Sequence, residues 1–152
     1  MQAESLDLEF VDHPDVRAVL DDYYSQTRRA AESDSYLGVI VGCGAVVEGI
    51  LTWALLGAEL EASQSGKAGK DKAGNILPIE RWPLTNLIDT ASAIGLIGNT
   101  AKQASWALKD FRNFVHPYNL LQQSARPDAA LAMSAMAALK EIARSLAGRR
   151  AS

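Results

Sequence analysis

Three polar residues that can act together on a phosphate group lie within one short segment. Arg112, Asn113 and His116 occur in residues 109–118, which read KDFRNFVHPY. Arg112 and His116 are four residues apart, so on a helix they share one face about one turn apart. An arginine presents a permanently charged fork to phosphate, a histidine moves protons near neutral pH, and an asparagine orients a hydroxyl or phosphate oxygen. The opposite side of that helix carries apolar residues expected to face the core: Leu108, Phe111 and Val115.

A reaction that uses such a set without a metal is the cleavage of RNA by its own 2′-hydroxyl group. His116 would take the 2′ proton or protonate the leaving oxygen, and Arg112 would stabilise the charge that develops at phosphorus. The alternative is structural, with Arg112 and His116 pairing with nearby carboxylates and capping the helix. Spacing alone favours that alternative, because Arg and His four residues apart are common. Tyr118, just beyond Pro117, either stacks on a base beside these residues or simply packs.

The composition is that of one folded domain, predicted over residues 1–152. The chain has 152 residues, 48% of them hydrophobic and 22% charged, with a net charge of −3. This balance argues against disorder and against a generally basic nucleic-acid binder, although it allows a local basic patch. The single cysteine, Cys43, excludes a disulfide scaffold, and one cysteine with two histidines is too few for the usual zinc sites. No cofactor or metal is expected.

Helical spacing of apolar residues dominates the chain and predicts an all-α bundle of four or five helices. The expected helices cover residues 14–33, 35–62, 83–95, 100–116 and 129–147. Pro117 should end or bend the fourth helix, and Asp128 should cap the fifth. Residues 63–78 are expected to form a flexible surface loop and residues 148–152 a frayed tail. The loop lysines are either solvating groups or phosphate contacts: Lys67, Lys70 and Lys72.

The second expected helix is unusually apolar. Residues 37–58 hold one charge, Glu48, and are long enough to span a bilayer. A buried central helix is the favoured interpretation, because Glu48 sits in mid-run, basic flanks are missing and the other helices have apolar stripes to cover. The N-terminal residues also show no targeting signal, so a cytoplasmic location is expected. Glu48 should pair with Arg112, His116 or a backbone N–H, either to hold the fold or to orient the reactive side chains.

Three segments together resemble the HEPN superfamily, the higher eukaryotes and prokaryotes nucleotide-binding domains. Residues 112–117 (RNFVHP) resemble its Arg-Asn-x-x-His-Pro element. Residues 36–51 resemble the long apolar helix of bacterial members, in which small residues precede a glutamate, and residues 84–97 resemble the helix and turn before the motif helix. The resemblance covers residues 34–146. The common form of the family has four to six residues between Arg and His, whereas three occur here.

The resemblance implies an all-α bundle that forms a homodimer, in which two motif helices build one composite cleft. It implies metal-independent RNase activity, often in toxin–antitoxin or phage-defence systems, with RNA or a nucleotide as substrate and an antitoxin protein as a possible partner. Arg112, Asn113 and His116 would be the catalytic residues. The alternative is a non-catalytic module of the same fold that binds nucleotide, RNA or a partner protein. Apolar faces that carry Met133 and Met136 also favour a second subunit.

Overall fold

The computed structural model describes residues 5–106, 108, 112–121 and 126–151, and in these residues the fold is all-helical with no strand. The predicted fold class is therefore confirmed. In chain order the elements are α1 (Pro14–Glu32), α2 (Tyr36–Leu56), α3 (Glu59–Gln64), the 3₁₀ helix η1 (Ile79–Arg81), α4 (Leu84–Ala93), α5 (Asn99–Ser105), α6 (Arg112–Val115), α7 (Pro117–Leu120) and α8 (Ala129–Ala151).

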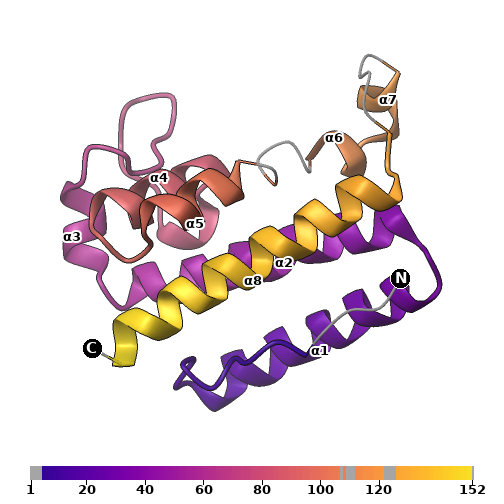
Figure 1. Ribbon diagram of the computed structural model, residues 1–152. Helices are drawn as coiled ribbons and strands as arrows, with labels where there is room; N and C mark the ends of the chain where they lie inside the picture. Colours follow the sequence, from indigo (N-terminus) through magenta and orange to yellow (C-terminus); the bar gives the residue numbers. More distant parts are fainter. Residues whose placement is uncertain (1–4, 107, 109–111, 122–125, 152) are drawn as a thin grey trace.

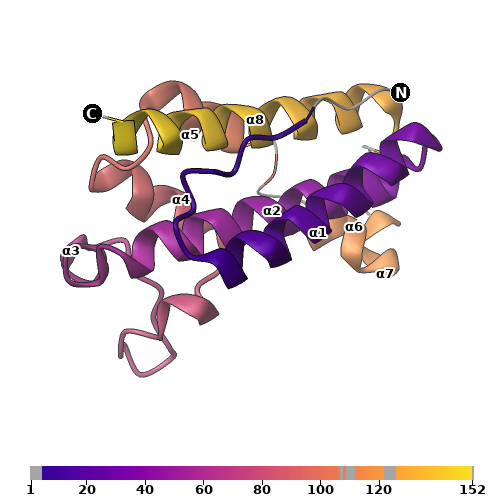
Figure 2. The ribbon, with the colours of Figure 1, turned by 90° about the horizontal axis from the view of Figure 1, so that it is seen from below.

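The helix α2 lies at the centre of the bundle. It contacts α1, α8, α4, α6 and η1, with α1 running alongside it in the opposite direction and α8 in the same direction (Figures 1 and 2). Its most apolar 18-residue window has a mean hydropathy of 2.1, so among the described helices α2 alone could cross a membrane by length and composition. Half of that window is buried inside the bundle. Packing on several sides supports the buried-helix interpretation. The buried residues of α2 are Val39, Ile40, Cys43, Gly44, Val46, Val47, Ile50, Leu51 and Leu55.

The turns around α2 follow from single residues. Asp34 adopts a left-handed conformation (φ 54°) after α1, and Ser35 N–H then donates to the Ala30 carbonyl over 2.8 Å, which closes a Schellman-type cap. At its other end α2 stops at Leu56, six residues before the predicted boundary. Gly57 has a low helix propensity, and the chain turns there into the separate helix α3.

The fourth predicted helix is wrong as a single element. It is divided into α5, α6 and α7, and residues 107 and 109–111 lie outside the described part of the chain. In the last turn of α5 the Ser105 hydroxyl donates to the Ala101 carbonyl over 2.6 Å, a local bond that competes with helix continuation. The break near His116 is as expected, because α6 ends at Val115 and Pro117 begins α7.

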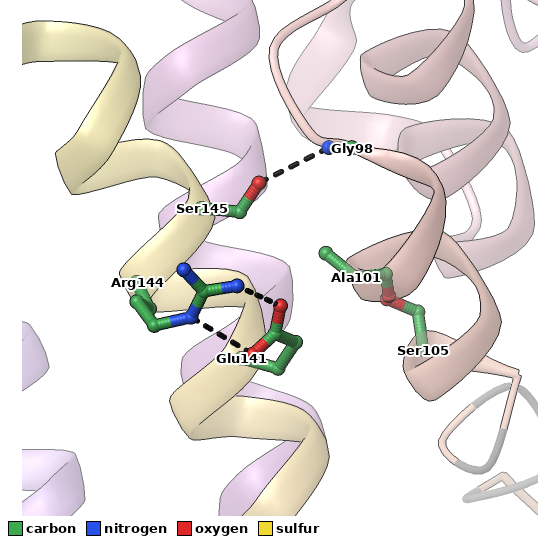
Figure 3. A network of polar contacts seen from close by, with 6 residues as sticks. All are labelled: Gly98, Ala101, Ser105, Glu141, Arg144 and Ser145. Atoms are coloured by element: carbon green, nitrogen blue, oxygen red, sulfur yellow. Dashed lines mark hydrogen bonds and ion pairs between the residues drawn. The ribbon is translucent and has the colours of Figure 1, made fainter.

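The helix α8 ties the second half of the chain to α2. Asp128 Oδ1 accepts a hydrogen bond from Leu131 N–H over 2.8 Å, which confirms the predicted cap. The helix then continues to Ala151, past the predicted end at residue 147. Its Ser145 hydroxyl accepts a bond of 3.1 Å from Gly98 N–H at the start of α5 (Figure 3). The same figure shows the surface ion pair of Glu141 and Arg144, which lies within α8.

Candidate functional site

The candidate motif lies on two single-turn helices joined by a bend. Arg112 and Asn113 are the first two residues of α6, His116 forms the bend, and Pro117 starts α7. The backbone therefore places Arg112 one helical turn before His116. The side chains of Arg112 and Asn113 lie outside the described part of the structure, so the predicted grouping of the three polar groups stays a prediction.

The segment is fastened to the core through one aromatic residue. Phe114 is 8% exposed and joins the core, and α6 contacts α2 near the turn between α1 and α2 (Figures 1 and 2). Leu108 is buried as expected, but Val115 is exposed, because the division of the helix turns Phe114 inward in its place. Phe111 lies outside the described residues. A buried Phe114 holds the backbone beside His116 while that side chain faces outward.

The residues that follow Phe114 are open to solvent. The His116 side chain is exposed, Tyr118 is 83% exposed and Leu121 is 74% exposed. Tyr118 therefore has little contact with the described residues, and its stacking on a base stays a prediction. An exposed imidazole with an exposed aromatic ring two residues away can meet a large substrate that a deep cavity would exclude.

Glu48 is half-buried on α2 and lines a groove of about 450 Å³ between α1 and α2. Tyr23 of α1, Thr52 of α2 and Glu80 of η1 are also part of its lining. All described residues that line the groove belong to α1, α2 or η1, and none belongs to the segment that carries Arg112 and His116. Pairing of Glu48 with Arg112 or His116 therefore stays a prediction.

The groove also exposes apolar side chains of α1. Val19 and Tyr23 belong to the apolar stripe of α1, yet both are exposed at its rim. Of the two methionines expected on a free face, Met133 is 61% exposed, but Met136 is buried against Cys43 with 3.2 Å between the two sulfur atoms. The expectation for Met136 is therefore wrong.

Other reactive groups of the described residues have structural roles. Burial raises the pKa of the Cys43 thiol to about 12, so the sulfur stays protonated at neutral pH and acts as a small apolar group. His13 caps α1, with its Nδ1 accepting a bond of 3.3 Å from Val16 N–H. Within the described residues, no three His, Cys, Asp or Glu side chains come together as a metal site.

Comparison with known protein families, curated proteins and solved structures finds no match to this chain. The resemblance to the HEPN superfamily therefore rests on the sequence motifs.

Proposed function

We propose that the chain is a metal-independent endoribonuclease of HEPN type, with Arg112, Asn113 and His116 as its catalytic residues. The observation that carries the proposal is the exposed His116 at the bend between α6 and α7, one helical turn after Arg112. A proton-transfer group must reach the 2′-hydroxyl of its substrate, and an exposed imidazole meets that requirement for a polymer. The toxin–antitoxin or phage-defence setting comes from the family resemblance.

The proposed reaction is an internal attack by the RNA on its own phosphate. The His116 imidazole takes the proton of a 2′-hydroxyl, the 2′-oxygen bonds to phosphorus, and the bond from phosphorus to the 5′-oxygen breaks. The leaving oxygen must gain a proton as the bond breaks, and the products are a 2′,3′-cyclic phosphate and a 5′-hydroxyl. The Arg112 guanidinium stabilises the negative charge on the phosphate oxygens, and Asn113 positions the substrate.

A second copy of the chain supplies the second proton-transfer group in this proposal. One imidazole cannot hold the 2′ proton and donate a different proton at the same moment, whereas two motifs that face each other provide a base and an acid. Val115 and Leu121 are exposed apolar residues near His116, and a second subunit would cover them. Tyr118 can also stack on a base, which is worth about 1–3 kcal/mol in single-stranded RNA recognition.

A matched pair of histidine variants tests the proposal. His116→Asn removes the proposed acid–base group, and His13→Asn makes the same change at the only other histidine, where asparagine preserves the helix cap. In EDTA, His116→Asn should reduce cleavage of mixed RNA by roughly 10²–10⁴-fold, while His13→Asn should cleave as wild type. Arg112→Lys should recover little of the activity lost in Arg112→Ala, because an ammonium lacks the planar fork.

Two results would contradict the proposal. If His116→Asn and Arg112→Ala both cleave as fast as wild type, the activity comes from a contaminant. If the wild-type protein forms a dimer but leaves every RNA intact, the non-catalytic module that binds nucleotide, RNA or a protein becomes the better account.

A further inference from the structure

The loop between α3 and η1 is held in shape by its own hydrogen bonds. Lys70 and Ile76 form an antiparallel bridge, and Leu77 N–H donates to the Gly69 carbonyl over 2.9 Å. At the tip, Asp71 Oδ1 accepts bonds of 2.9 Å from the N–H groups of Ala73 and Asn75. We call residues 65–78 the lysine loop. These bonds give its tip the geometry of a tight hairpin turn.

The base of the lysine loop is fastened to the core. The Trp82 ring is 2% exposed and lies against Gly69, where an added Cβ would be 2.6 Å from Trp82 Cδ1. Trp82 Nε1 donates to the Leu77 carbonyl over 2.8 Å, and Asn86 Nδ2 donates to the Lys67 carbonyl over 3.1 Å. Ala68 is buried beside them. The loop is therefore a scaffold that presents its exposed side chains from fixed backbone positions.

The side chains that this scaffold presents are cationic. Lys67, Lys70 and Lys72 are exposed, and among the described residues the structure gives their ammonium groups no carboxylate partner. The lysine loop, residues 65–78, carries three cations and one carboxylate, in a chain whose net charge is −3. The loop is thus a local positive surface on an acidic protein.

The lysine loop and the α6–α7 segment project from the same side of the bundle. Both lie above α2 in Figure 1, and both lie below α2 in Figure 2, where α8 is on the other side. The helix α2 spans the distance between them, and its 21 residues correspond to about 30 Å. A flexible polyanion that reaches His116 can therefore also run toward the loop along one face.

We propose that Lys67, Lys70 and Lys72 bind backbone phosphates of single-stranded RNA and extend the substrate site away from α6 and α7. The inference rests on the proposed function, since it takes RNA as the ligand. Lysine ammonium groups neutralise phosphates without reading sequence, and each contact releases counterions from the strand. An ordered loop backbone reduces the entropy lost when the contacts form.

The test measures RNA binding in a background that cannot cleave. The parent protein carries His116→Asn, and two triple variants are made in it. Each protein is titrated with a labelled single-stranded RNA at several salt concentrations between about 50 and 200 mM. The first replaces Lys67, Lys70 and Lys72 with Gln. The second, a matched control, makes Lys102→Gln, Lys140→Gln and Arg144→Gln on α5 and α8, away from the proposed RNA path.

The loop variant should bind about tenfold or more weakly at low salt. The slope of log K against log salt is negative, and its magnitude should fall by about 2, because each of the three phosphate contacts on a single strand contributes roughly 0.7. The control should keep the wild-type slope. Equal affinity and slope in both variants, or no RNA binding by the parent protein, would overturn the inference and leave the lysines as solvating groups.

The two proposals fail in different ways. Cleavage that depends on His116, together with a loop variant that binds as the control does, removes the loop inference and leaves the ribonuclease. Lysine-dependent RNA binding by a protein that never cleaves RNA removes the ribonuclease and retains the loop as an RNA-binding surface.

Discussion

Replacing Gly42 with alanine should destabilise the protein through its contact with α1. A Cβ built at Gly42 meets Thr27, with Oγ1 as the nearest atom and Cβ and Cγ2 both at 3.1 Å. Thr27 is 2% exposed, and its hydroxyl donates to the Tyr23 carbonyl over 2.9 Å. A threonine side chain in a helix has few χ1 choices, so the clash must be relieved by moving α1 or by breaking that bond.

The expected cost is the difference between two opposing effects. Overpacking in a well-packed interface costs about 1–3 kcal/mol. Alanine is favoured over glycine within a helix by about 0.5–1 kcal/mol. The difference between these ranges is about 0–2.5 kcal/mol, and the closeness of Thr27 Oγ1 to the added Cβ places Gly42→Ala in its upper part. We therefore expect the free energy of unfolding to fall by about 1–2.5 kcal/mol, which corresponds to a fall in Tm of about 2–10 °C for a chain of this length.

Urea denaturation followed by circular dichroism measures the effect. Gly148→Ala is the control, because Gly148 also lies in a helix but a Cβ there meets nothing within 4 Å, so this change should be neutral or stabilising. Thr27→Ala should recover part of the loss when combined with Gly42→Ala, and a double-mutant cycle measures that coupling. If Gly42→Ala is as stable as wild type, α1 does not lie as close to α2 as the structure has it.

Three further predictions concern the lysine loop and the core. Gly69→Ala should displace the Trp82 ring, so the Nε1–H proton of Trp82 should exchange with solvent faster than in wild type, and unchanged exchange would contradict the packing. Cys43 should resist thiol reagents at pH 8 and react only after unfolding. Because burial raises the pKa of Cys43 from 9.0 to about 12, the thiol stabilises the fold fully below about pH 9 and less as the pH rises toward 12. Urea titrations should show this alkaline loss in wild type and a smaller loss in Cys43→Ala.

Structural features that depend on residues close together in the sequence could be predicted. Pro117 cannot continue a regular helix, and α6 ends before it. Asp128 precedes an alanine- and leucine-rich run and caps α8. The continuous apolar character of residues 37–58 predicted the central position of α2.

Features that depend on distant contacts were not predictable. No glycine or proline marks the end of α5, so the spacing of residues 100–116 favoured one long helix, and the division turns Phe114 toward the core. The glycines of residues 63–78 indicated a flexible loop, but its base is held by Trp82 and Asn86, which lie outside that segment in sequence. The position of Glu48 in the groove also depends on how α1 and η1 pack against α2.

The chemistry of the cut ends tests the central claim most directly. Wild-type protein in EDTA is incubated with an RNA whose cleavage position has been mapped, beside the same RNA carrying a 2′-deoxy nucleotide on the 5′ side of the cleaved bond. The proposal predicts a 2′,3′-cyclic phosphate and a 5′-hydroxyl from the first RNA, no cut in the second, and little product from His116→Asn. Ends with a 3′-hydroxyl and a 5′-phosphate, or equal cleavage of the deoxy substrate, would contradict it.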